Sequence, residues 1–158
     1  MQPVLRSLPS LLVSLVVALG VGFISSVVTR PAIEGWYATL SKPPLNPPNF
    51  VFAPVWTLLF IMMAVAAWLV WRAGRREARR QLALYGIQLA LNAGWSLVFF
   101  GLISPGWALV EVVFLLAAIA ATAYGFGRWS VWAQRLLWPY LAWVAFAAYL
   151  TLGIWWLN

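Results

Sequence analysis

The amides of Gln88 and Asn92 and the indoles of several tryptophans are the candidate functional side chains of this sequence, because most of the usual catalytic groups are absent. The 158 residues include no histidine, no cysteine and no aspartate, and the carboxylates are Glu34, Glu77 and Glu111. A hydrolytic triad needs a histidine or an equivalent base, and a metal site needs clustered histidine, cysteine or carboxylate ligands. The sequence therefore excludes disulfides and thiolate chemistry, and we expect no metal site.

The carboxamides share one helical face with two aromatic residues. Gln88, Asn92, Trp95 and Phe99 are spaced i, i+4, i+7 and i+11, which places them on one side of an α-helix. An amide surrounded by hydrocarbon must find hydrogen-bond partners, so we expect this face to point into a helix bundle. Two interpretations of the amides remain open: they contact a ligand, or they join helices.

Aromatic residues form comparable stripes in two other segments. Phe52, Trp56 and Phe60 are spaced i, i+4 and i+8, while Trp143 is followed at i+4 by Ala147, which leaves room beside the indole. A single aromatic stripe is more often core than pocket. Three stripes that lie near small residues make a pocket between helices, lined by aromatic rings with a few polar groups, a stronger alternative to a simple core.

The elements that position these stripes are long apolar helices. The chain is 65% apolar and 8% charged, whereas a soluble domain is typically about 45–50% apolar and about 25% charged. A bilayer core of about 30 Å is crossed by roughly 20 apolar residues in a helix. Five segments qualify: 8–28, 50–71, 82–102, 106–126 and 133–156. We predict an all-α membrane protein, with a single five-helix transmembrane domain over residues 1–158.

Lysine and arginine indicate the orientation of these spans. Eight arginines fall in the amino-terminal tail and in the second–third and fourth–fifth loops, whereas the other side carries only Arg30 and Lys42. By the positive-inside rule the amino terminus is cytoplasmic and the carboxyl terminus is outside. We interpret the basic run at 72–80 as a topology signal with affinity for anionic headgroups, not as a nucleic-acid site. A bacterial inner membrane is the expected location.

The connection between the first two spans is rich in proline and aromatic residues. Proline fixes φ and removes a hydrogen-bond donor, so segment 36–56 is expected to be rigid and extended and to fold over the mouth of the bundle as a lid. Asn46 followed by Pro47 predicts the cap and first residue of the next helix. The expected lid residues are Lys42, Pro43, Pro44, Asn46, Pro47 and Pro48.

A strip of small residues occupies another face of the third span. Gly86, Ala90 and Gly94 recur every four residues, about 200° around the helix from Gln88. Such strips let helices approach closely in lipid. Because the polar face already takes the interior, we expect this strip to form a homodimer interface; the alternative is packing within the same chain.

Four segments resemble the TspO/MBR family, which includes the tryptophan-rich sensory proteins and the mitochondrial translocator protein. They are WYATLSKPPLNPP at 36–48, FAPVWTLLF at 52–60, QLALNAGWSLVFF at 88–100 and PYLAWVAFAAYL at 139–150. The resemblance implies a five-helix bundle, often dimeric, with a cavity closed by the first loop. It implies binding of tetrapyrroles, including porphyrins and haem precursors, and of synthetic isoquinoline or benzodiazepine-type ligands, with no required cofactor. Its implied ligand-binding residues are Tyr37, Phe52, Trp56, Phe60, Asn92, Trp95, Ser96, Phe99, Trp143 and Ala147.

Two departures from the family pattern concern the fifth span. Thr151 follows Leu150 where family members commonly have asparagine, so one polar contact there is weaker or lost. No lysine or arginine follows Tyr140 or Tyr149, so the forward sterol motif is absent; the reversed form is a weak pattern. Sterol binding is therefore poorly supported by the sequence.

Three classes of function are consistent with this resemblance. The leading interpretation is a binding protein or sensor for a flat apolar ligand. The second is degradation of protoporphyrin in light and oxygen, for which Trp56 and Trp143 are the candidate catalytic residues. The third is transport, in which Glu111, the carboxylate inside a span, is either functional or, more simply, reaches toward the membrane surface or pairs with Lys42.

Overall fold

Five long helices dominate the fold, which a computed structural model describes for residues 7–74 and 77–158. They are α2 (Leu8–Glu34), α4 (Asn49–Gly74), α5 (Arg79–Ser96), α6 (Pro105–Gly127) and α7 (Val131–Leu157). A one-turn helix, α3 (Trp36–Thr39), follows α2, and a π-helical turn, η1 (Leu97–Gly101), ends α5. Each of the five is long and apolar enough to cross a membrane. The predicted all-α fold and its five spans are confirmed, with ends that shift by up to six residues.

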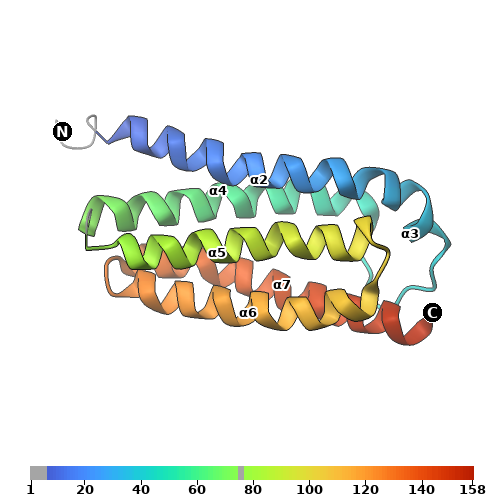
Figure 1. Ribbon diagram of the computed structural model, residues 1–158. Helices are drawn as coiled ribbons and strands as arrows, with labels where there is room; N and C mark the ends of the chain where they lie inside the picture. The colour runs from blue at the N-terminus through green and yellow to red at the C-terminus, as the bar shows by residue number, and fades with distance from the viewer. Residues whose placement is uncertain (1–6, 75–76) are drawn as a thin grey trace.

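The helices run side by side, and successive helices reverse direction (Figure 1). The α4–α5 and α6–α7 connections lie at one end of the bundle. At the other end lie α3, segment 40–48, the η1–α6 connection and the carboxyl terminus. The loop between α2 and α4, the η1–α6 connection and the carboxyl terminus therefore lie at one end of the bundle, which we call the α3 end.

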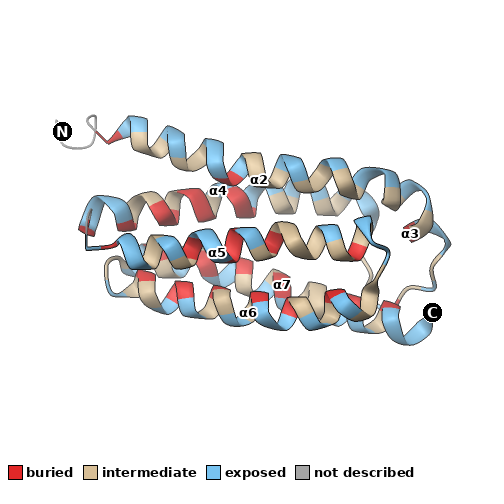
Figure 2. Ribbon diagram, in the orientation of Figure 1, coloured by how far each residue is buried: buried red, intermediate tan, exposed pale blue. Residues whose placement is uncertain are grey.

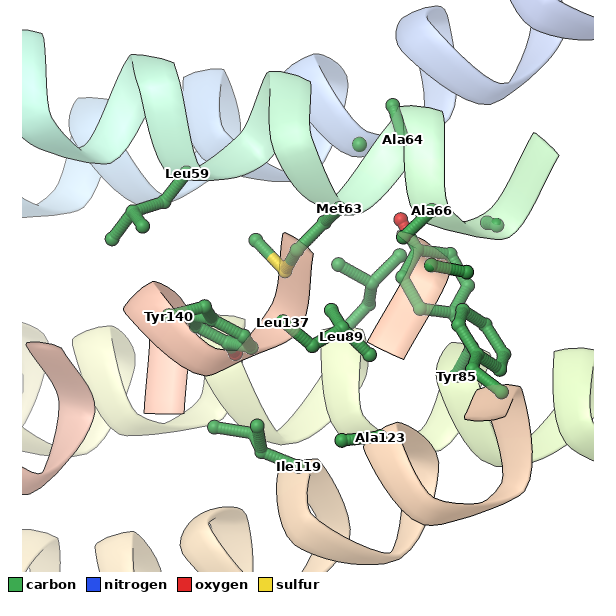
Figure 3. Close-up of a cluster of buried hydrophobic side chains, with 14 of the residues drawn as sticks. Leu59, Met63, Ala64, Ala66, Tyr85, Leu89, Ile119, Ala123, Leu137 and Tyr140 are labelled. Atoms are coloured by element: carbon green, nitrogen blue, oxygen red, sulfur yellow. The ribbon is translucent and has the colours of Figure 1, made fainter. Parts of the chain in front are cut away.

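The core lies between α4, α5, α6 and α7. Met63, Leu89, Ile119 and Tyr140, one from each of these helices, are buried in one layer, as Figure 3 shows. Helix α2 is more peripheral, because Ala18 is the one residue of Leu8–Glu34 that is buried (Figure 2). Apolar residues that face outward on such helices are expected where the solvent is lipid.

Helix α4 begins at Asn49, so the prediction that Asn46 caps a helix starting at Pro47 is wrong. The Asn46 side chain is used elsewhere: its Oδ1 accepts a hydrogen bond from the Tyr37 hydroxyl (2.8 Å), and its Nδ2 donates to the Pro47 carbonyl (3.2 Å). The first turn is instead closed by the Val51 amide, which donates to the Pro48 carbonyl (3.0 Å). The expected extended run is likewise shorter than 36–56, because residues at both of its ends are helical.

Segment 40–48 is bonded to the carboxyl-terminal half of α7 and to Asn158 just beyond it. The Asn158 amide group pairs with the backbone of Ser41, accepting from its N–H and donating to its carbonyl, each at 3.0 Å. The Tyr149 hydroxyl donates to the Pro44 carbonyl (2.8 Å). Between these contacts Pro43 is buried against Gly153, where an added Cβ would lie 2.5 Å from the proline Cβ. Glycine at this point of α7 is therefore what lets the segment lie so close to the helix.

Substitution Gly153→Ala is expected to destabilise the protein by about 1–3 kcal/mol, because the new methyl group must displace Pro43. The matched control is Gly20→Ala on α2, where an added Cβ would meet nothing within 4 Å; this change is expected to be neutral or stabilising, since alanine favours a helix. Thermal unfolding in detergent, followed by circular dichroism, measures both. Equal melting temperatures for the two variants would contradict the packing described.

Candidate functional site

A cavity of about 510 Å³ lies near the α3 end of the bundle, between α2, α3, α4, α5, η1 and α7. Most of its lining is aliphatic or aromatic. Ten of the residues implicated from the sequence line it: Tyr37, Phe52, Trp56, Phe60, Asn92, Trp95, Ser96, Phe99, Trp143 and Ala147. The geometry thus brings together side chains from four separate parts of the chain. Ligand binding at these residues stays a prediction.

The aromatic rings of the lining also contact one another across helices. Phe52 of α4 meets Trp143 of α7 edge to face, with ring centroids 6.1 Å apart. Trp56 lies 5.8 Å from Phe60 and 6.3 Å from the ring of Tyr140. Offset and edge-to-face pairs of this kind are favourable beyond their burial. One wall of the cavity is therefore an aromatic surface held by α4 and α7 together.

Another wall contains the π-helical turn. The ring centroids of Trp95 and Phe99 are stacked 5.2 Å apart, and that of Phe100 lies 4.7 Å from Phe99 and 6.0 Å from Trp95. Phe99 and Phe100 both line the cavity from η1, which is closed by a hydrogen bond from the Leu102 amide to the Leu97 carbonyl (2.8 Å). The sequence contains no signal that we recognised for this π-turn.

Gln88 does not line the cavity, although the spacing placed it with Asn92. Gln88 is fully buried in a polar network farther from the α3 end than the cavity. In this network the Tyr140 hydroxyl donates to Gln88 Oε1 (2.7 Å), and Gln88 Nε2 donates to the sulfur of Met63 (3.7 Å). Asn92 Nδ2 donates to the Tyr140 hydroxyl (3.0 Å). Of the two interpretations left open, helix joining therefore applies to Gln88, whereas Asn92 both joins helices and lines the cavity.

Tyr140 is the central residue of this network, and the sequence analysis missed it. A signal was present, because Tyr140, Trp143, Ala147 and Thr151 are spaced i, i+3, i+7 and i+11 on α7. Helix α2 was missed as well. Its inward face is marked by small and polar residues at i, i+3, i+4 and i+7, namely Gly22, Ser25, Ser26 and Thr29.

The contribution of α2 is a thin wall that leaves the cavity open in part. Gly22 lies so close to α4 that an added Cβ would be 2.7 Å from the ring of Phe60. Phe23 on α2, and Ala53 and Thr57 on α4, all line the cavity and are exposed, so the cavity reaches the surface of the bundle on this side.

No residue of segment 40–48 lines the cavity; the nearest part of the first loop that does is Tyr37 of α3. The expected lid residues Lys42, Pro43, Pro44, Asn46, Pro47 and Pro48 are not among its lining residues. Lys42 Nζ lies 4.9 Å from the centre of the Tyr37 ring and donates to the Leu40 carbonyl (3.3 Å). Burial raises the pKa of Tyr37, with a smaller opposing effect of its hydrogen bond to Asn46, so its hydroxyl is a neutral donor at pH 7. The role of the segment as a lid stays a prediction.

Two further sequence features lie outside the cavity. Glu111 lines a separate groove beside η1, and both of its oxygens are buried with no hydrogen-bond partner in the part of the chain described here. The suggested ion pair with Lys42 is wrong, because Lys42 contacts Tyr37 and Leu40 instead. In the small strip, Gly86 and Ala90 are exposed, and Gly94 lies beside Glu111. A homodimer through this strip stays a prediction.

The cavity is suited to binding more than to acid–base chemistry. No carboxylate lines it, and no group of three histidine, cysteine or acidic residues that could hold a metal occurs within residues 7–74 and 77–158. Its polar groups are the Arg30 guanidinium, the Asn49 and Asn92 amides and several hydroxyls. The indole nitrogens of Trp95 and Trp143 are buried without a partner.

Comparison with known proteins gives a consistent result over almost the whole chain. The profile of the TspO/MBR family matches residues 13–157. The Tryptophan-rich protein TspO of Chlorobaculum tepidum is 46% identical over 142 residues, which cover 89% of this chain and 90% of that protein. The Translocator protein of Sus scrofa is 42% identical over 151 residues, with 94% and 89% covered. The Tryptophan-rich sensory protein of Cereibacter sphaeroides is 36% identical over 139 residues, with 87% and 85% covered.

Substitution Tyr140→Phe is expected to lower the stability of the bundle by about 1–3 kcal/mol, because it leaves Gln88 Oε1 and Asn92 Nδ2 buried without their partner. Tyr124→Phe is the matched control, since Tyr124 is 74% exposed on α6, and it should change stability by less than about 0.5 kcal/mol. Chemical or thermal unfolding in detergent measures the difference. If both variants unfold together with the unmodified protein, the network does not hold α5 to α7.

Proposed function

The chain belongs to the TspO/MBR family, and on that premise we propose that it is an integral membrane binding protein for tetrapyrroles and similar flat, largely apolar molecules. The ligand occupies the cavity near the α3 end. Names such as tryptophan-rich sensory protein and translocator protein among its relatives fit a protein that responds to or carries a small molecule.

One observation carries this proposal: Trp56, Asn92 and Trp143, from three different helices, line the same cavity. Small-molecule sites are typically 300–1,000 Å³ in volume, mostly apolar, and supplied with a few polar groups that orient the ligand. A cavity of about 510 Å³ lies within this range. Flat rings pack well against indoles in stacked or edge-to-face arrangements, so a conjugated macrocycle suits this lining.

The polar groups of the cavity favour a metal-free porphyrin over haem. Haem iron in proteins is held by histidine, cysteine, methionine or tyrosine, and Tyr37 is the one such residue in the lining. Its hydroxyl already donates to Asn46. A hydrogen bond from the Asn92 amide can orient a polar atom of a macrocycle instead.

Degradation of protoporphyrin in light and oxygen is a second candidate function. It is favoured by the position of Trp56 and Trp143, both in the lining and both able to lie beside a photoexcited macrocycle. Because the lining holds no general acid–base pair, the reactivity would come from the excited porphyrin, and the protein would supply oxidisable indoles close to it.

The charge distribution supports a defined orientation in a bacterial inner membrane. Arg72, Arg79, Arg80, Arg128 and Arg135 belong to the end of the bundle opposite α3, whereas Arg30 and Lys42 belong to the α3 end (Figure 1). On the basis of the positive-inside rule we propose that the α3 end, with segment 40–48 and the carboxyl terminus, lies outside the cytoplasm.

Substitution Trp143→Ala is expected to weaken protoporphyrin IX binding about 10-fold, the equivalent of about 1.4 kcal/mol, because one aromatic face of the cavity is lost. Quenching of the remaining tryptophan fluorescence measures the affinity. Trp132→Ala is the matched control, since Trp132 is exposed and outside the lining. An unchanged isotherm for Trp143→Ala would place the ligand elsewhere.

Illumination of the same samples in air tests the second candidate function, degradation of protoporphyrin, which requires that a new absorbing product appears.

The absence of cysteine allows a clean test of orientation. Ser41→Cys, in segment 40–48, and Glu77→Cys, in the α4–α5 connection, each introduce a single exposed thiol. In intact bacterial cells a membrane-impermeant maleimide should label Ser41→Cys and should label Glu77→Cys only after the cells are lysed. Labelling of Glu77→Cys in intact cells would reverse the proposed orientation.

A further inference from the structure

Arg30 is the one formally charged residue in the lining of the cavity. It lies on α2, it is exposed, and it forms no ion pair with any carboxylate in the described part of the chain. Glu34, one turn further along α2, is close enough in sequence to pair with it but does not. Glu111 lies in the separate groove, and Glu77 belongs to the opposite end of the bundle. The charge of Arg30 is therefore available to a ligand.

The position of Arg30 relative to the aromatic residues follows from the helix geometry. Gly22 of α2 lies against the ring of Phe60, and Arg30 is eight residues further along, which is about 12 Å toward the α3 end at 1.5 Å per residue. On the antiparallel helix α4, Asn49 lies eleven residues before Phe60, about 16 Å in the same direction. Both residues line the cavity, so it has an aromatic floor at Phe60 and a polar rim at Arg30 and Asn49.

We propose that Arg30 binds a carboxylate of the ligand at this rim, so that the cavity selects flat apolar molecules that carry an acidic group at one edge. This inference rests on the proposed function and specifies its ligand. The guanidinium presents forked donors that match a carboxylate. Because Arg30 is exposed at the rim, the acidic group stays near the membrane surface while the apolar body enters the cavity, and the cost of burying a charge is avoided.

The rest of the cavity lining also favours an anionic ligand over a cationic one. No aspartate or glutamate lines the cavity to repel an anion. A cationic ligand would meet Arg30 with no compensating carboxylate, whereas an anionic ligand meets a cation.

The test compares protoporphyrin IX with its dimethyl ester, which has the same macrocycle but no carboxylates. Binding of both is measured in a nonionic detergent to the unmodified protein, Arg30→Gln and Arg30→Lys. Arg30→Gln should weaken binding of the acid about 10-fold. This loss is at the lower end of the range expected for a charge-assisted hydrogen bond, because the site is exposed. Binding of the ester should be unchanged, and Arg30→Lys should retain most of the affinity for the acid. Arg128→Gln, which makes the same change in net charge on an exposed residue at the opposite end, should alter neither.

The outcomes separate this inference from the proposed function. An unchanged ratio of acid to ester affinity in Arg30→Gln would overturn it and leave Arg30 as a contact for lipid headgroups. Equal weakening of both porphyrins would also overturn it, because the effect would then be on the structure. If neither porphyrin bound the unmodified protein, the proposed function itself would fail. Retained binding of the ester by Arg30→Gln shows in the same experiment that the variant is folded.

Discussion

Polar groups inside this bundle can be satisfied only by one another, because hydrocarbon offers them no hydrogen bonds. The amides of Gln88 and Asn92 on α5 meet this constraint at a single hydroxyl, that of Tyr140 on α7. Once these bonds are made, the rotation of α5 and α7 about their axes is restricted. The same restriction aims Trp95 and Trp143 at a common space. The cavity is therefore a consequence of the network beneath it as much as of its own aromatic lining.

Above the network the helices separate enough to leave that space, and two local features shape it. The π-helical turn η1 contributes Phe99 and Phe100 to the lining. Helices α2 and α4 approach closely where Gly22 meets Phe60, whereas the lining residues Ala53 and Thr57 are exposed. The site therefore has an aromatic floor and a more accessible rim.

The first loop serves this arrangement indirectly. Pro43 packs on α7 and the Pro44 carbonyl is bonded to it, whereas Tyr37 is the residue of the loop that lines the cavity. Proline limits the conformations of the unfolded loop, and the contacts with Ser41 and Pro44 then hold one of them against α7. Tyr37, which is bonded to Asn46, is thereby held in place at the mouth of the cavity.

The sequence by itself determined the five spans, because the length of an apolar run and the thickness of a bilayer are both local quantities. It also determined which residues share a face of each helix, and the resemblance to the TspO/MBR family then implied that Phe52, Trp56, Asn92 and Trp143 belong to one site. Periodicity describes a face only relative to its own helix axis, however, and does not state which helix lies opposite. Only the tertiary structure decided that Gln88 bonds Tyr140 instead of lining the cavity, that α2 supplies a wall and Arg30, and that Asn46 bonds Tyr37 instead of capping a helix. Each of these depends on a partner distant in sequence or in another element.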